Sequence, residues 1–238
     1  MTERLKGKVA LITGAAQGLG KEMANSMIEE GAVVFISDIN ESELKKTCNE
    51  LSCQGINLDV TKSEDWISAI EFIKNEAGSL NILVNNAGIS PKGKNGSRLN
   101  TLNTDLKTWG QVFHVNFFAS VVLARGLQNE LANAEGAIVN VTSIAGSRVH
   151  PFAGPAYATS KAALSALTRE MASDFGPLKV RVNAIAPGEV ETDILSEGTD
   201  KIVKDIPLKR LGLPEEVANT IFFLCNTQSS YISGAEVH

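Results

Sequence analysis

The feature that most constrains this chain is a short apolar run that ends in a cluster of glycines. Residues 8–13 have the length and composition of a buried strand, and the segment Gly14-Ala15-Ala16-Gln17-Gly18-Leu19-Gly20 follows directly. A helix is predicted to open there and to continue to about Glu30. Glycines at a helix N-terminus let the backbone approach a pyrophosphate, and the free N–H groups favour an anion. A tight turn without a ligand is the competing interpretation.

The alternation of strand and helix continues along the chain without internal repeats. Strands are predicted near residues 8–13, 33–37, 55–59, 81–84, 136–142 and 179–185, and helices near residues 18–30, 41–51, 63–77, 105–131, 155–175 and 215–226. Right-handed crossovers between parallel strands place helices on both faces of such a sheet. The sequence therefore predicts an α/β fold, namely a single-domain, doubly wound (Rossmann-like) parallel sheet with helices on both faces.

An acidic residue ends the second predicted strand. Asp38 lies eighteen residues beyond Gly20, where a carboxylate can accept hydrogen bonds from both hydroxyls of an adenosine ribose and would repel a 2′-phosphate. Neither the segment from Gly14 to Gly20 nor the residues immediately after Asp38 include an Arg or Lys that could neutralise such a phosphate. Considered alone, Asp38 could serve only as a helix N-cap or turn residue. Together with the glycines it predicts NAD as the cofactor.

A tyrosine and a lysine are spaced for acid/base chemistry in the predicted helix 155–175. Tyr157 and Lys161 are four residues apart, which places the phenol and the ammonium on one helix face. A nearby cation favours the phenolate and so lowers the pKa of tyrosine from about 10 towards neutrality. Ser143, at the end of a predicted strand, can hydrogen-bond the oxygen that gains or loses the proton. This is the chemistry of alcohol–carbonyl interconversion, although a Tyr and a Lys at this spacing also occur by chance.

These motifs together resemble the short-chain dehydrogenase/reductase family, and the resemblance covers essentially the whole chain. The matching segments occur in the family's order and at its spacings. They are Thr13 to Gly20, Asp59-Val60, Asn85-Asn86-Ala87-Gly88, Asn116, Ser143, Tyr157 with Lys161, and Pro187-Gly188-Glu189-Val190-Glu191-Thr192.

The resemblance implies roles for residues that their spacing alone does not assign. Asp59 and the Val60 backbone would lie by the adenine, Asn85, Ala87 and Gly88 would line the ribose side, and Val190 and Thr192 would meet the nicotinamide carboxamide. Asn116 would kink its helix and hold a water molecule near Lys161. The expected catalytic set is Asn116, Ser143, Tyr157 and Lys161. The expected cofactor-binding set is Gly14, Gln17, Gly18, Leu19, Gly20, Asp38, Asp59, Val60, Asn86, Ala87, Gly88, Tyr157, Lys161, Pro187, Gly188, Val190 and Thr192.

Composition agrees with this assignment and excludes other classes. The 238 residues, 43% of them hydrophobic, suffice for one domain spanning residues 1–238. A net charge of −5 without a basic run argues against nucleic acid and against an anionic membrane as partners. The three Cys and three His do not show metal-site spacing, so no metal is expected. The N-terminus does not resemble a secretion signal and no apolar run is long enough to span a membrane, so the cytoplasm is the expected location.

Three segments differ from a minimal fold of this kind. Residues 90–104 form a long, polar and basic loop, which is either solvated or a rim over the active-site mouth. Residues 192–214 are expected to form a short helical substrate lid, because apolar and charged residues alternate there with helical spacing. At the C-terminus, residues 231–238 resemble the start of the family's last strand, which leads us to expect that this strand is truncated.

The substrate is the least constrained part of the prediction. Arg148 and His150 follow Ser143 by five and seven residues, and Glu189 follows the Pro187-Gly188 turn on the opposite side of the expected pocket. With Lys92, Lys94 and Arg98 at the rim, these residues favour a small, polar, hydroxylated or anionic substrate over a steroid or a long acyl chain. The alternative is that Arg148 and His150 point into solvent, as charged loop residues usually do.

The main hypothesis is an NAD-dependent dehydrogenase/reductase acting on CH–OH groups, which transfers a hydride between NAD(H) and a small polar secondary alcohol or carbonyl compound, with Tyr157 as general acid/base. A 3-oxoacyl thioester reductase of the acyl-carrier-protein type is an alternative, which Asp38 disfavours. A non-catalytic NAD-sensing protein is a remote alternative, since such a protein does not need Ser143, Tyr157 and Lys161 together. The apolar helix 105–131 predicts a homo-oligomer, most simply a homotetramer.

Overall fold

The computed structural model describes residues 3–192, 198 and 202–238. In this part of the chain seven parallel strands form one sheet in the order β3-β2-β1-β4-β5-β6-β7. The strands are β1 Val9–Thr13, β2 Val33–Asp38, β3 Gln54–Asn57, β4 Ile82–Asn85, β5 Ala137–Val141, β6 Arg181–Ile185 and β7 Glu236–Val237. The strand order reverses between β1 and β4, and a crevice at the carboxyl ends of parallel strands is expected at such a reversal.

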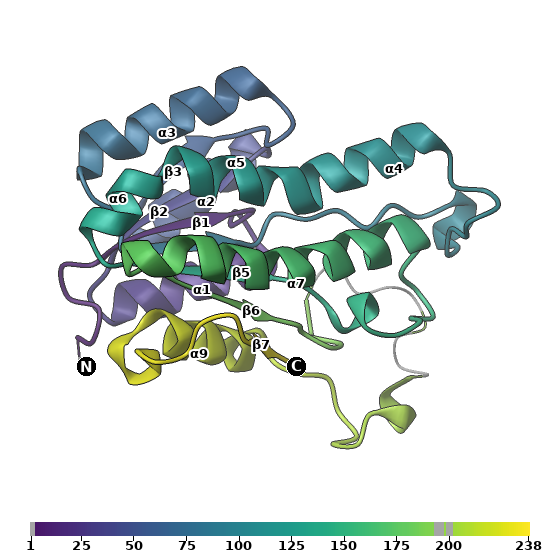
Figure 1. Ribbon diagram of the computed structural model, residues 1–238. Helices are drawn as coiled ribbons and strands as arrows, with labels where there is room; N and C mark the ends of the chain where they lie inside the picture. The colour runs from purple at the N-terminus through teal and green to yellow at the C-terminus, as the bar shows by residue number, and fades with distance from the viewer. Residues whose placement is uncertain (1–2, 193–197, 199–201) are drawn as a thin grey trace.

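Helices cover both faces of the sheet (Figure 1). The principal helices are α1 Gly18–Glu29, α2 Glu41–Leu51, α3 Ser63–Ala77, α4 Leu106–Phe113, α5 Ala119–Gly126, α6 Gln128–Asn133, α7 Pro155–Phe175 and α9 Pro214–Cys225. Alternate residues of each strand face opposite sides, so Ala10 and Ile12 of β1 pack in a core with α1, α2 and α9. Leu11 faces the second core, which α3, α5, α6 and α7 complete. The predicted α/β fold with helices on both faces is confirmed.

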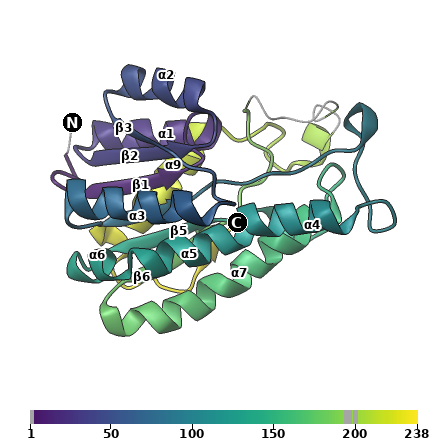
Figure 2. The same ribbon diagram turned by 90° about the horizontal axis from the view of Figure 1, so that it is seen from above.

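The predicted helix 105–131 is not continuous. A π-helical segment, His114–Phe118, separates α4 from α5, and α6 begins only after Leu127. A π-turn places one extra residue in the helix and is frequent at functional sites. Beyond this interruption α4 lies beside α7, and both extend past the sheet, as Figure 2 shows from above.

The predictions for the last strand and for the lid at residues 192–214 concern parts of the chain that the structure describes to different extents. Glu236–Val237 pairs in parallel with Ala184 and Ile185, so the last strand is present as a two-residue β7. Part of the expected lid, residues 193–197 and 199–201, lies outside the described residues. The described part of that segment includes a short 3-10 turn, Val203–Asp205. None of the helices in the described ranges combines the length and apolar character needed to cross a membrane.

Candidate active site

A cavity of about 590 Å³ lies at the carboxyl ends of the strands. Every residue of the predicted cofactor-binding set lines it, as do Ser143, His150 and Glu189 from the predicted catalytic and substrate sets. Three residues with predicted site roles do not line it, namely Asn85, Asn116 and Arg148. Its volume is within the range typical of ligand pockets in proteins. The motifs that are spread over the sequence therefore converge on one site.

The glycine segment forms the floor of one half of the cavity. Gly14 has a φ of +63°, and a Cβ there would lie 2.7 Å from the Cα of Ala87, so only glycine fits between β1 and the loop after β4. Thr13 fixes the same junction, because its Oγ1 accepts hydrogen bonds from the Asn86 and Ala87 N–H groups, both at 3.1 Å. The Asn86 side chain donates back to the carbonyl oxygens of Thr13 and Gly14.

The first turn of α1 faces this half of the cavity without a cap. Gln17, the residue before the helix, makes no side-chain capping bond, and the turn includes no acidic residue. Gly18 has a φ of +57°, and a Cβ there would meet no atom within 4 Å. Free N–H groups, a positive helix dipole and an open approach are the features that bind a phosphate group. The residues present therefore fit the pyrophosphate of a dinucleotide.

Asp38 and Asp59 line the part of the cavity next to this turn. The Asp38 carboxylate is oriented by two backbone N–H groups, since Oδ2 accepts from Ala16 at 3.1 Å and Oδ1 from Asn40 at 3.0 Å. Hydrogen bonds from Thr61 hold the pKa of the Asp59 carboxyl below its usual value. Fixed carboxylates at this position suit the donor groups of an adenosine, namely ribose hydroxyls and an amino group.

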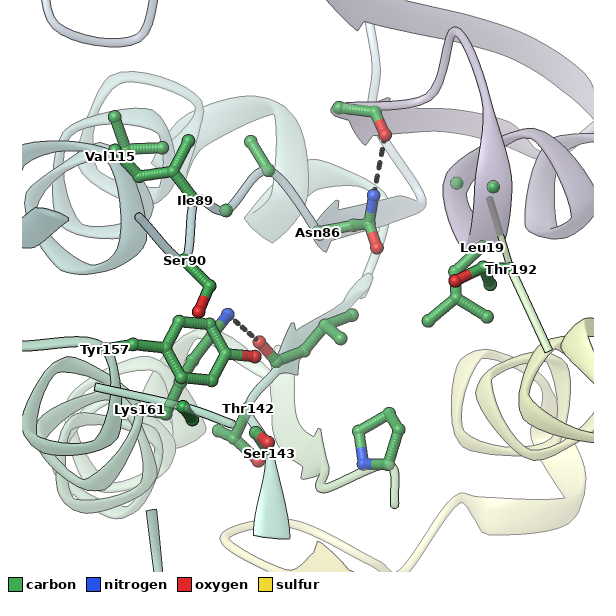
Figure 3. Close-up of a pocket in the computed structure, with 18 of the residues that line it drawn as sticks. Leu19, Asn86, Ile89, Ser90, Val115, Thr142, Ser143, Tyr157, Lys161 and Thr192 are labelled. Carbon is green, nitrogen blue, oxygen red and sulfur yellow. Dashed lines mark hydrogen bonds between the residues drawn. The ribbon is translucent and has the colours of Figure 1, made fainter. Parts of the chain in front are cut away.

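Tyr157, Lys161 and Ser143 lie together on the other side of the cavity, across from Leu19 and Thr192 (Figure 3). Pro155 begins α7, and the four-residue spacing places Tyr157 and Lys161 on one face of that helix, as predicted. Ser143 follows β5, and its hydroxyl is near enough to the Tyr157 phenol to lower the pKa of that phenol. The Ser143 Oγ also accepts from the Ala145 N–H at 3.2 Å, which orients the hydroxyl hydrogen away from the backbone. The three predicted side chains are therefore in one cluster.

The pKa of Tyr157 differs from the sequence prediction. Burial raises the pKa of the Tyr157 phenol, the Ser143 hydroxyl lowers it, and the negative charge of Glu189 raises it. Burial also lowers the pKa of the Lys161 ammonium to about 8. Its Nζ donates to the Val141 carbonyl at 2.6 Å and lies 5.7 Å from the Tyr157 ring centroid. The Tyr157 pKa is therefore raised in this structure, whereas the sequence predicted that it would be lowered towards neutrality.

Asn116 lies behind the cluster, in the π-helical segment. Its side chain accepts from the Ile89 N–H at 2.8 Å, and it donates to the Ile89 carbonyl at 3.1 Å and to Ser160 Oγ at 3.0 Å. Ser160 in turn donates to the Tyr157 carbonyl at 2.7 Å. Asn116 therefore ties the loop after β4 to the helix that carries Tyr157, in addition to any water-holding role that the resemblance implies.

His150 and Glu189 form a polar wall next to Tyr157. His150 Nε2 hydrogen-bonds Glu189 Oε1, and the two side chains are only 12% and 15% exposed. His150 Nδ1 accepts from the backbone N–H groups of Phe152 at 3.2 Å and Ala153 at 3.3 Å. Glu189 is fixed through its backbone, because its carbonyl accepts from the Gly212 N–H at 2.9 Å. His150 and Glu189, which the sequence analysis placed on opposite sides of the pocket, are therefore in direct contact.

The basic residues predicted at the rim have other partners. Lys92 lines the cavity, but its Nζ donates to the Phe152 carbonyl at 2.6 Å. Arg98 Nε donates to the carbonyls of His150 and Ala153, at 3.1 and 2.8 Å. Arg148 is exposed and does not reach the cavity, which corrects its proposed substrate role. Lys94 is also exposed, in a 3-10 turn. Residues 90–104 thus border the mouth of the cavity, but Lys92 and Arg98 in this segment bind backbone carbonyls of residues 150–153.

One further prediction is wrong and several lining residues were missed. Asn85 was expected to line the ribose side, but it is buried in β4 and donates to Asn140 Oδ1 at 2.8 Å, because alternate strand residues face away from the cavity edge. The missed lining residues are Ser37, Ile39, Leu58, Thr61, Ile89, Ser90, Gln111, Val115, Val141, Thr142, Ile144, Ala145, Phe152 and Ala153. Ser90 could have been found, since it follows Gly88 at the carboxyl end of a strand. Within the described ranges no three His, Cys, Asp or Glu side chains converge to hold a metal ion.

Curated relatives match the chain over almost its whole length. Residues 14–238 match the family model described as enoyl-(acyl carrier protein) reductase. Protein FixR from Bradyrhizobium diazoefficiens is 48% identical, over 99% of this chain and 86% of that protein. The 3-oxoacyl-[acyl-carrier-protein] reductase FabG from Aquifex aeolicus is 35% identical, over 100% of this chain and 98% of its own. The 7alpha-hydroxysteroid dehydrogenase from Escherichia coli is 34% identical, over 97% of this chain and 92% of the enzyme.

Solved structures are also similar to this chain over almost its whole length. A short-chain dehydrogenase/reductase family oxidoreductase from Brucella ovis, in complex with a partially ordered NAD, is 46% identical with a TM-score of 0.82, and the match covers 97% of this chain and 98% of that one. A 3-oxoacyl-[acyl-carrier protein] reductase from Brucella melitensis with bound NAD is 34% identical with a TM-score of 0.91, over 99% of this chain and 90% of that chain.

Proposed function

The chain belongs to the short-chain dehydrogenase/reductase family of oxidoreductases, and we propose that it transfers a hydride between NAD(H) and a small polar secondary alcohol or carbonyl compound. The observation that carries this proposal is the cluster of Tyr157, Ser143 and Lys161 in the same cavity as the uncapped first turn of α1. A protein that only sensed a dinucleotide would not need the three catalytic side chains beside it.

The proposed chemistry divides between the dinucleotide and the protein. The dinucleotide, when bound, would accept or donate the hydride. The Ser143 hydroxyl would donate a hydrogen bond to the substrate oxygen and polarise it. Tyr157 would exchange the proton with that oxygen, and its raised pKa keeps the phenol protonated at neutral pH, as the reduction of a carbonyl requires. Lys161, with a pKa of about 8, would carry the positive charge that favours the phenolate in the opposite direction.

We propose NAD rather than NADP as the preferred cofactor. Asp38 lines the cavity with its carboxylate fixed by two backbone N–H groups, so a 2′-phosphate at that position would face a negative charge that cannot turn away. Relatives crystallised with NAD support this choice. The residues that would hold the dinucleotide are Gly14 to Gly20, Asp38, Asp59, Asn86, Lys161 and Thr192.

A second candidate activity is the reduction of a 3-oxoacyl thioester, which the names of two relatives favour. Their sequences are 35% and 34% identical to this chain, which leaves room for a different substrate. In this chain the substrate side of the cavity includes a carboxylate, that of Glu189. A 3-oxoacyl thioester presents only carbonyl oxygens near its reacting carbon, and these would face the carboxylate unfavourably. For that reason we place this candidate second.

We also propose that one domain spans residues 1–238, with a lid near 192–214, and that four copies form a homotetramer. Apolar side chains remain exposed on α4 and the π-helical segment, with Leu106 86% and Phe118 45% accessible. A second copy packed there would remove this surface from water. The cytoplasm remains the predicted location, and the three free thiols are typical of a reducing compartment.

The test of the proposed activity is the absorbance of NADH during incubation with a panel of sugars, polyols, hydroxy acids, heterocyclic alcohols and steroid alcohols, run in both directions. Turnover of a small polar alcohol or its ketone by the wild-type protein, and its loss in Tyr157→Phe, is the expected result. Turnover confined to 3-oxoacyl thioesters would favour the second candidate. Tight NADH binding without turnover of any compound would contradict both activities.

A further inference from the structure

The carboxylate of Glu189 has an unused hydrogen-bonding capacity inside the cavity. One oxygen, Oε1, accepts from His150, while Oε2 makes no hydrogen bond to any residue in the described part of the chain. The side chain is 15% exposed and lines the cavity that also holds Tyr157 and Ser143. A carboxylate with so little access to water is unfavourable unless a donor group contacts it.

The partner of Glu189 leaves its negative charge intact. His150 Nδ1 faces the backbone N–H groups of Phe152 and Ala153, so this nitrogen is an acceptor and is not protonated. The hydrogen of the imidazole is then on Nε2, where it is donated to Glu189. A neutral histidine orients the carboxylate without neutralising it. Lys92 does not neutralise it by contact either, because its ammonium is bonded to the Phe152 carbonyl.

The position of Glu189 is set by rigid backbone on both sides. The preceding Pro187 carbonyl accepts from the Ile144 N–H at 3.2 Å, and the Glu189 carbonyl accepts from the Gly212 N–H at 2.9 Å. Ile144 directly follows Ser143, so the carboxylate is held relative to the catalytic serine. Glu189 and Tyr157 line the same cavity, and the charge of the carboxylate raises the pKa of the phenol. A molecule of a few carbons that contacts Tyr157 can therefore also reach Glu189.

We infer that Glu189 is a specificity-determining residue, which accepts a hydrogen bond from a second hydroxyl or an ammonium group of the substrate. This inference rests on the proposed function and narrows its substrate class to diols and amino alcohols, or the corresponding hydroxy and amino ketones. Anionic substrates are disfavoured, because they would meet the Glu189 carboxylate. The nearby cations remain charged, and Lys92 interacts with Glu189 through space, but Lys92 Nζ donates to the Phe152 carbonyl and Arg98 Nε donates to the His150 and Ala153 carbonyls. Purely apolar alcohols leave the carboxylate without a partner.

The experiment uses matched secondary alcohols on one carbon skeleton. The four compounds differ only in one group, which is a hydroxyl, an ammonium, a methyl or a carboxylate. That group is attached to the carbon next to the carbinol carbon or to the following carbon. With wild-type protein and NAD, kcat/KM for the hydroxyl or ammonium compound should exceed that for the methyl compound about 10- to 100-fold, with the carboxylate compound poorest. In Glu189→Leu this ratio should fall to within about threefold. Glu189→Gln, which keeps the shape but not the charge, should lose mainly the ammonium preference.

Two controls separate this inference from the proposed function. Glu191→Leu removes an exposed carboxylate two residues away that does not line the cavity, and it should keep the wild-type ratio. Binding of the same compounds to the NADH complex, followed by the shift in melting temperature, tests recognition without turnover. If no compound turns over but the diol binds more tightly than the methyl compound only when Glu189 is present, the proposed reaction fails and the inference stands. Preference for the methyl or carboxylate compound, or a ratio unchanged in Glu189→Leu, overturns the inference.

Discussion

Gly18 offers a direct test of how the first turn of α1 binds its ligand. A methyl group added at Gly18 would meet no protein atom within 4 Å, so Gly18→Ala adds no clash inside the protein. The backbone there has a φ of +57°, in which an L-residue costs about 1 to 2 kcal/mol. The free energy of unfolding should therefore fall by about that amount and no more.

The effect on dinucleotide binding should be larger, because the methyl group occupies the open approach to the N–H groups of the helix. Loss of one charge-assisted hydrogen bond to phosphate costs about 1.5 to 3 kcal/mol, which raises the dissociation constant of NADH about 10- to 100-fold. Fluorescence titration with NADH measures this constant, and urea denaturation measures the stability of the same preparation.

Gly78 provides a matched control for backbone strain. It ends α3 with a φ of +64°, and a Cβ there would also meet no atom within 4 Å, but it does not line the cavity. Gly78→Ala should show the same loss of stability and the wild-type affinity for NADH. The reasoning is refuted if Gly18→Ala binds NADH as tightly as Gly78→Ala does, since the uncapped turn would then not contact the cofactor.

Four other predictions concern the cofactor, the acid, the buried lysine and the assembly. Asp38→Ala should weaken the preference for NAD over NADP, and comparable kcat/KM with both cofactors in the wild type would contradict the assignment. Tyr157→Phe should lower turnover by about 10²-fold or more while NADH still binds, because a phenyl ring cannot exchange a proton; retained activity at every pH would mean that another group is the acid. Burial lowers the Lys161 pKa to about 8, so between about pH 8 and pH 10.5 the unfolded chain binds more protons than the folded one. Over that range the free energy of unfolding of the wild type, relative to Lys161→Met, should rise by up to about 3 kcal/mol. Urea-unfolding free energies that change in parallel with pH for the two proteins would contradict this. Light scattering should give the mass of four chains, reduced in Phe118→Glu, whereas a monomeric wild type at micromolar concentration would refute the tetramer.

The sequence predicted those parts of the molecule that depend on local patterns. Each predicted strand agrees with the structure to within one or two residues, because a short apolar run bounded by glycine or polar residues has few other solutions in an α/β chain. Every residue of the predicted cofactor-binding set lines the cavity for a similar reason. The lining of the cofactor half follows directly from strand ends and the glycine turn, whose positions are fixed by the sheet.

The substrate half was predicted less well, because its geometry depends on contacts between loops. Arg148 and His150 are two residues apart in one loop, yet only His150 faces the cavity. The basic character of residues 90–104 suggested a site for anions, but Arg98 donates to backbone carbonyls, which have no signature in the sequence. The resemblance implied a kink at Asn116, but the apolar spacing of residues 114–118 also fits a regular α-helix and did not indicate a π-helical segment.

The contacts of Lys92 and Arg98 also bear on how this protein could acquire new substrates. Both side chains hold residues 150–153 through main-chain carbonyls, which are present whatever amino acids occupy those positions. Substitutions of His150 or Phe152 can therefore change the chemistry of the wall while the loop keeps its anchor. The cofactor half, by contrast, is built from glycines and strand ends that tolerate little change. Diversity introduced at residues 150–153, with Lys92 and Arg98 retained, should therefore yield folded variants of altered specificity more often than diversity introduced at Lys92 and Arg98 themselves.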